Sequence, residues 1–94
     1  MKQLKHLRIA ILLAATVSAC LAQSLRQAAD RDGILIGTAV RPAQLSEANY
    51  ASTLAREFNM IEAEDAMKWW IVRPDRTHYN FGPGDDIVRF AQAH

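Results

Sequence analysis

The sequence has a single cysteine, Cys20, and no long hydrophobic run, no internal repeat and no excess of charge of one sign. One cysteine excludes an internal disulfide, so stability has to come from packing. Half of the residues are apolar and 22% are charged, which argues against a disordered or fibrous chain. With 94 residues, the chain forms at most one small domain.

The eleven basic and ten acidic residues give a formal net charge of +1. Three of the basic residues, Lys2, Lys5 and Arg8, precede the tenth position, which leaves eight basic against ten acidic residues in the rest of the chain. Nucleic-acid phosphates require a basic face. We therefore expect no nucleic-acid partner.

The first 22 residues have the layout of an export signal. The basic start is followed by an apolar stretch over residues 9–17 and by small residues before Cys20. The stretch is shorter than the ~20 residues that a membrane-spanning helix needs. The order Val17, Ser18, Ala19, Cys20 resembles a bacterial lipobox, which predicts a lipid anchor on Cys20. The alternative is cleavage after Ala22 and release of a soluble protein, secreted or periplasmic.

Hydrophobic spacing predicts a helix over residues 21–30, ended by Gly33, and a strand over residues 34–36 that is buried on both sides. A second helix opens at Ser46 and ends at Asn59. Its apolar stripe consists of Tyr50, Leu54 and Phe58.

A second strand begins at Met60 and leads into a long loop, and Asp85 begins a last helix with an apolar face. That face consists of Ile87, Phe90 and Ala91. Helices that alternate with strands predict an α/β fold with a parallel sheet. Two strands alone leave exposed edges and an uncovered face, so we expect more sequence to complete the domain.

Acidic residues gather at the end of the second strand, namely Glu62, Glu64 and Asp65. Paired carboxylates suit glycoside hydrolysis, but neighbours on one strand rarely flank a sugar from both sides. The alternative is that these acids are solvated and balanced by Lys68 and Arg73. Trp69 and Trp70 follow, and such rings either stack on sugars or pack in a core. The histidines lack the spacing of a metal site, so no metal is expected.

Residues 58–69, FNMIEAEDAMKW, resemble the FN-x-x-x-x-EN-x-MKW motif of glycoside hydrolase family 10. The resemblance extends over residues 24–94. It implies a (β/α)8 TIM barrel, of which residues 23–94 supply the first two or so βα units. It also implies an endo-1,4-β-xylanase that hydrolyses internal bonds of xylan with retention and needs no cofactor.

The family's two catalytic glutamates follow strands four and seven, which implies that no catalytic residue lies in this stretch. The resemblance assigns substrate binding, with xylan or xylo-oligosaccharides as partner, to Glu64, Asp65, Lys68 and Trp69. Asp65 departs from the family's asparagine, because a carboxylate lacks the amide donors and adds a negative charge beside Glu64. Two alternatives are a non-catalytic carbohydrate-binding lipoprotein or pseudoenzyme remnant, and a small exported structural protein.

Overall fold

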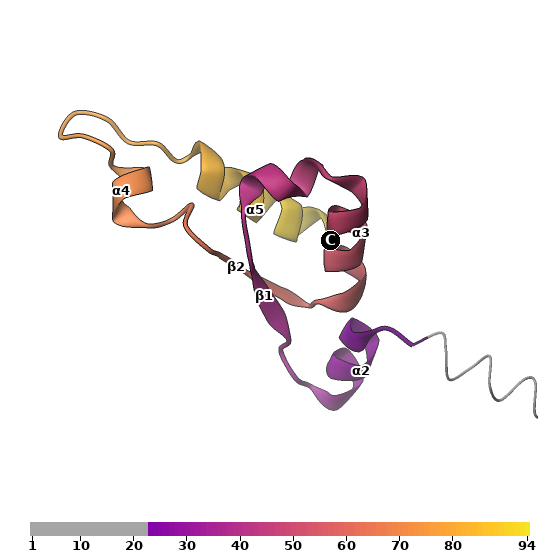
Figure 1. Cartoon of the computed structure of the whole chain (residues 1–94). Coiled ribbons are helices and arrows are strands. Elements are labelled where there is room, and N and C mark those ends of the chain that lie inside the picture. The colour runs from indigo at the N-terminus through magenta and orange to yellow at the C-terminus, as the bar shows by residue number, and fades with distance from the viewer. Residues whose placement is uncertain (1–22) are drawn as a thin grey trace, which may run out of the picture.

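The computed structural model describes residues 23–94, in which helices alternate with two parallel strands (Figure 1). The strands, β1 (Gly37–Val40) and β2 (Met60–Ala63), pair with Gly37 opposite Met60. The predicted alternation and the parallel sheet are confirmed. The other elements are α2 (Leu25–Asp32), the 3-10 helix η1 (Pro42–Ser46), α3 (Ala48–Glu57), α4 (Trp69–Val72) and α5 (Gly82–Ala93).

The predicted export signal over residues 1–22, with the predicted lipid anchor on Cys20, lies outside the described residues. Within residues 23–94, no helix has both the length and the apolar character that crossing a bilayer requires.

Helix α2 has defined caps at both ends. The Ser24 hydroxyl accepts a hydrogen bond from the Gln27 amide at 3.1 Å, and the Gln27 side chain accepts one from the Ser24 amide at 3.0 Å, which forms a capping box. At the other end, Gly33 has φ of 67°, a left-handed conformation that glycine adopts without steric cost. The predicted stop at Gly33 is confirmed. The helix itself runs two residues past the predicted end at residue 30, to Asp32.

The predicted strand over residues 34–36 is wrong. Ile34 and Leu35 are 57% and 72% exposed, and the strand starts at Gly37 instead. The cause is the helix cap, because the Ile34 amide donates to the Ala29 carbonyl at 2.8 Å and so still belongs to the end of α2. Pairing with β2 starts at Ile36, whose carbonyl accepts from the Met60 amide at 3.2 Å.

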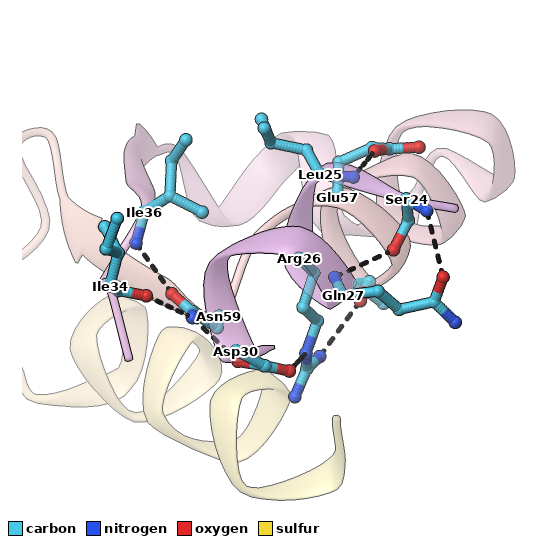
Figure 2. Close-up of polar contacts among 10 residues, drawn as sticks. Ser24, Leu25, Arg26, Gln27, Asp30, Ile34, Ile36, Glu57 and Asn59 are labelled. Carbon is cyan, nitrogen blue, oxygen red and sulfur yellow. Dashed lines mark hydrogen bonds and ion pairs between the residues drawn. The ribbon is translucent and has the colours of Figure 1, made fainter. Parts of the chain in front are cut away.

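Asn59 connects the end of α2 to the start of the sheet (Figure 2). Its side-chain oxygen accepts from the Ile36 amide at 2.7 Å. Its side-chain nitrogen donates to the Ile34 carbonyl at 2.9 Å and to Asp30 at 2.8 Å. These bonds satisfy the Ile36 amide and the Ile34 carbonyl, two backbone groups just before β1.

The core lies between the sheet, α3 and α5. Its buried residues are Val40, Leu54, Ala66 and Ile87, and the larger partly buried side chains against them include Tyr50, Phe58 and Phe90. Tyr50 and Leu54 of the predicted stripe thus face the core from α3, and Phe58 does so from the extended residue after the helix. For the last helix, Ile87 and Phe90 face the core as predicted, whereas Ala91 is exposed.

Several element boundaries differ from the prediction. Helix α2 begins at Leu25 rather than at residue 21. Helix α3 begins at Ala48, because Ser46 ends η1, which Pro42 opens, and it ends at Glu57 rather than at Asn59. Helix α5 begins at Gly82 rather than Asp85, with Pro83 in its first turn, where the missing amide hydrogen has no cost. The short helix α4 lies within the predicted loop, next to the extended residues 73–81 and at the opposite end of the fold from α2 (Figure 1).

Candidate functional site

The two strands end side by side. Val40 pairs with Ala63 as the last residue of each strand, and the Glu64 amide donates to the Val40 carbonyl at 3.0 Å. Because the sheet is parallel, the residues that follow β1 and β2 leave it at the same edge. This edge therefore brings Arg41 next to the predicted site residue Glu64.

Arg41 and Glu64 form a two-point ion pair. The Nε of Arg41 donates to one carboxylate oxygen of Glu64 at 2.8 Å, and Nη2 donates to the other at 2.6 Å. This fork fixes the plane of the carboxylate as well as its position. The hydrogen bonds and the charge of Glu64 raise the pKa of Arg41 above its ordinary value. The Glu64 side chain is still 41% exposed, so a ligand can reach it.

Lys68 and Asp65 form the second ion pair. The ammonium of Lys68 donates to one oxygen of Asp65 at 2.6 Å, and the Lys68 amide donates to the Asp65 carbonyl at 2.9 Å within the same turn. The hydrogen bond from Lys68 is the main cause that lowers the pKa of Asp65, and the positive charges of Lys68 and Arg41 lower it further. The predicted balancing of the acids by Lys68 is confirmed.

The two tryptophans face different cations. The Lys68 ammonium lies 5.3 Å from the centre of the Trp70 ring, within the range of a cation–π contact. Trp69, which is 67% exposed, has the guanidinium of Arg73 at 5.8 Å instead. Arg73 also lies 4.7 Å from the Tyr79 ring and has no ion pair with an acid among residues 23–94, so its predicted balancing of the acids is wrong.

The loop over residues 73–81 is ordered by local hydrogen bonds. Asp75 accepts from the Thr77 amide at 2.7 Å and from the His78 amide at 2.9 Å, and His78 Nδ1 lies 2.8 Å from the same carboxylate. The bonds from Thr77, followed by those from His78, lower the pKa of Asp75. Within the described part of the chain, no group of three or more His, Cys, Asp or Glu residues is placed to hold a metal.

Two residues of this edge were not predicted as site residues. Arg41 was missed because the first strand was placed three residues too early, which left Arg41 in the middle of a loop. Trp70 was considered together with Trp69 as a ring that stacks on sugars or packs in a core, but only Trp69 was assigned to substrate binding. The signal for Arg41 is its position directly after a strand that is parallel to the one preceding Glu64.

The site therefore combines carboxylate acceptors, an ammonium, a guanidinium and exposed aromatic rings. Sugar hydroxyl groups both donate and accept hydrogen bonds, and the apolar faces of sugar rings stack on aromatic side chains. This arrangement is chemically suited to a neutral polyhydroxylated ligand.

Comparisons with known proteins find xylanases among the relatives of this chain. The chain is 39% identical over 61 residues to a β-1,4-xylanase of Dictyoglomus thermophilum, covering 65% of the chain and 17% of that protein. It is 40% identical over 65 residues to endo-1,4-β-xylanase A of Thermoanaerobacterium saccharolyticum, covering 68% of the chain and 6% of that protein. The chain thus spans less than a fifth of the length of either relative.

Solved structures are also similar. Xylanase B from Clostridium stercorarium F9 superimposes with a TM-score of 0.69 at 32% identity, covering 76% of this chain and 20% of that one. Xylanase 10B from Thermotoga petrophila RKU-1, solved in complex with xylobiose, gives a TM-score of 0.68 at 36% identity, covering 74% of this chain and 22% of that one.

The sequence profile described as glycosyl hydrolase family 10 matches residues 24–94, nearly all of the described chain. Its (β/α)8 barrel alternates strands and helices, and the parallel pair β1 and β2 with its helices is consistent with part of such a barrel. The family predicted from the motif over residues 58–69 is confirmed: this chain belongs to glycosyl hydrolase family 10.

Proposed function

We propose that this chain supplies part of the xylan-binding surface of a retaining endo-1,4-β-xylanase. The observation that carries the proposal is the convergence of Glu64, Asp65 and Lys68 at the carboxyl end of β2, beside the end of β1. In (β/α)8 barrels, this end of the sheet is where substrates bind. The xylanase relatives and the xylobiose complex of a similar structure give further support.

The proposal extends to the architecture of the chain. Residues 23–94 contribute the first two or so βα units of the barrel, and residues 1–22 direct export. Processing at Cys20 attaches the protein to a membrane through lipid, and intact mass spectrometry of the exported protein tests this. A diacylated Cys20 at the mature N-terminus supports the anchor, whereas an unmodified chain that starts after Ala22 replaces it with release.

Each proposed site residue binds sugar rather than cleaving it. Glu64 and Asp65 accept hydrogen bonds from sugar hydroxyls, because each carboxylate keeps lone pairs that its basic partner does not use. Lys68 donates from its ammonium, and Trp69 offers an exposed ring face. The reaction itself needs an acid and a nucleophile about 5 to 5.5 Å apart across the sugar, which adjacent residues of one strand do not provide.

Titration of the chain with xylobiose tests the binding role, with amide chemical shifts as the readout. We expect the largest shifts at residues 64–69. Removal of the ammonium in Lys68→Met should weaken binding about tenfold to a hundredfold, the loss expected for a hydrogen bond to a charged group. The matched control is Arg31→Gln, which removes an exposed cation that pairs with its neighbour Asp32 on α2, far from the proposed site.

Shifts confined to α2, or equal affinity in the two variants, contradict the proposed site. The activity is tested separately on the complete protein with soluble xylan, by following the anomeric signals of the first products. Retention requires that β-anomers form first. Binding without any hydrolysis supports the non-catalytic alternative instead.

A further inference from the structure

Arg41 lies outside the residues that the family motif assigns, yet it makes the most defined contact of the site. We propose that Arg41 is a positioning residue: its guanidinium holds the Glu64 carboxylate in place for a sugar hydroxyl, and its charge offsets the extra negative charge of Asp65. This inference rests on the proposed function of the site.

The first part of the inference follows from the geometry of the fork. Both oxygens of Glu64 accept from Arg41, at 2.6 and 2.8 Å, so the carboxylate cannot rotate without losing a bond. A carboxylate has about four lone-pair sites, and the fork uses one on each oxygen. The remaining sites are available to sugar hydroxyls. Arg41 therefore orders the acceptor before a ligand arrives, which lowers the entropy cost of binding.

The second part concerns charge. Where Asp65 stands, the family motif has a neutral asparagine, which would leave Glu64 and Lys68 as a balanced pair. Asp65 adds one negative charge, and Lys68 is already its partner at 2.6 Å. Without Arg41, two carboxylates would share one cation, a like-charge arrangement that disfavours ionisation of both. With Arg41, each carboxylate has its own cation.

The pKa of Asp65 reports the same coupling. It is lowered mainly by the hydrogen bond from Lys68, and the charge of Arg41 contributes a smaller part across the two strand ends. Arg41 thus acts on Asp65 without a direct hydrogen bond. If Arg41 had a purely structural role, its replacement would not change the pKa of Asp65.

The test uses four variants of the full chain, titrated with xylobiose: Arg41→Gln, Arg41→Lys, Asp65→Asn, and the double variant Arg41→Gln with Asp65→Asn. We expect Arg41→Gln to weaken binding about fivefold and Arg41→Lys to lose less, because the lysine keeps the charge but not the fork. The double variant should recover the part of the loss that is due to charge, because the asparagine removes the charge that Arg41 offsets, while the loss of the fork to Glu64 remains. Arg31→Gln again serves as the control.

Unchanged affinity in Arg41→Gln, or a double variant whose loss is the sum of the two single losses, overturns the inference. A second readout separates it from the proposed function. Carboxyl-carbon chemical shifts followed with pH should show a higher pKa of Asp65 in Arg41→Gln than in the wild type, with or without sugar. If the wild type does not bind xylobiose, the proposed function fails; if the pKa of Asp65 does not move, the inference fails by itself.

Discussion

The substitution Gly37→Ala tests how closely the two strands approach. Gly37 begins β1 opposite Met60. A Cβ atom at this position would lie 2.8 Å from the backbone oxygen of Met60 and 2.9 Å from its terminal methyl carbon. The methyl group can rotate away, but the backbone oxygen moves only if the strands separate. We expect the overpacking to cost about 1–3 kcal/mol of folding free energy.

Urea unfolding followed by circular dichroism measures this cost. The matched control is Gly82→Ala at the start of α5, where the nearest atom, Oδ1 of Asn80, would lie 3.6 Å from the new Cβ. Gly82 has no positive φ, so alanine there should change stability by less than about 0.5 kcal/mol. Equal unfolding midpoints for the two variants would refute the argument that the close approach of β1 and β2 requires a glycine at position 37.

Three further predictions concern the polar contacts of the fold. Asn59→Ala should cost about 1–3 kcal/mol, because it leaves the Ile36 amide without its partner, and faster hydrogen exchange at that amide checks the cause. Ser24→Ala should cost about 1 kcal/mol by removing the N-cap of α2, whereas Ser52→Ala, an exposed serine within α3, should cost less; thermal unfolding compares them. Folding lowers the pKa of Asp75 below its ordinary value of 3.8. Asp75 therefore contributes fully to stability when the pH is above 3.8, and this contribution is lost as the pH falls through the lower pKa of the folded state. Asp75→Asn should flatten this acid dependence of stability in unfolding experiments.

The sequence predicted the elements whose apolar residues repeat regularly. The spacing of Tyr50, Leu54 and Phe58 matches one face of a helix, and this face packs against the core. The first strand was misplaced because Ile34 and Leu35 are more apolar than residues 37–40. Hydrophobicity alone does not show that a left-handed glycine cap keeps the next residue bonded to the helix. The short helix α4 has no periodicity long enough to detect.

At the candidate site, the motif identified residues that the structure places together at the strand ends, but it did not identify their contacts. Glu64 and Lys68 were found because both belong to one continuous string of residues. The partner of Glu64 is 23 positions away, and only the parallel register of β1 and β2 brings it close. Register depends on the pairing of complete strands, so an error of three residues in one strand was enough to hide Arg41.

Ala66 anchors the short turn that carries Asp65 and Lys68, so that both ion pairs of the site remain exposed to solvent. It lies between Asp65 and Lys68 in the sequence, it is only 5% exposed, and it belongs to the buried cluster of the core. A small apolar side chain fixed in the core holds the backbone of this turn against the sheet, so that the charged side chains on either side of it remain accessible. The position of the charged side chains at this edge therefore depends on core packing as well as on the ion pairs. In this chain, the core packing of Ala66 and the two ion pairs on either side of the turn together hold the carboxylates of Glu64 and Asp65 in place.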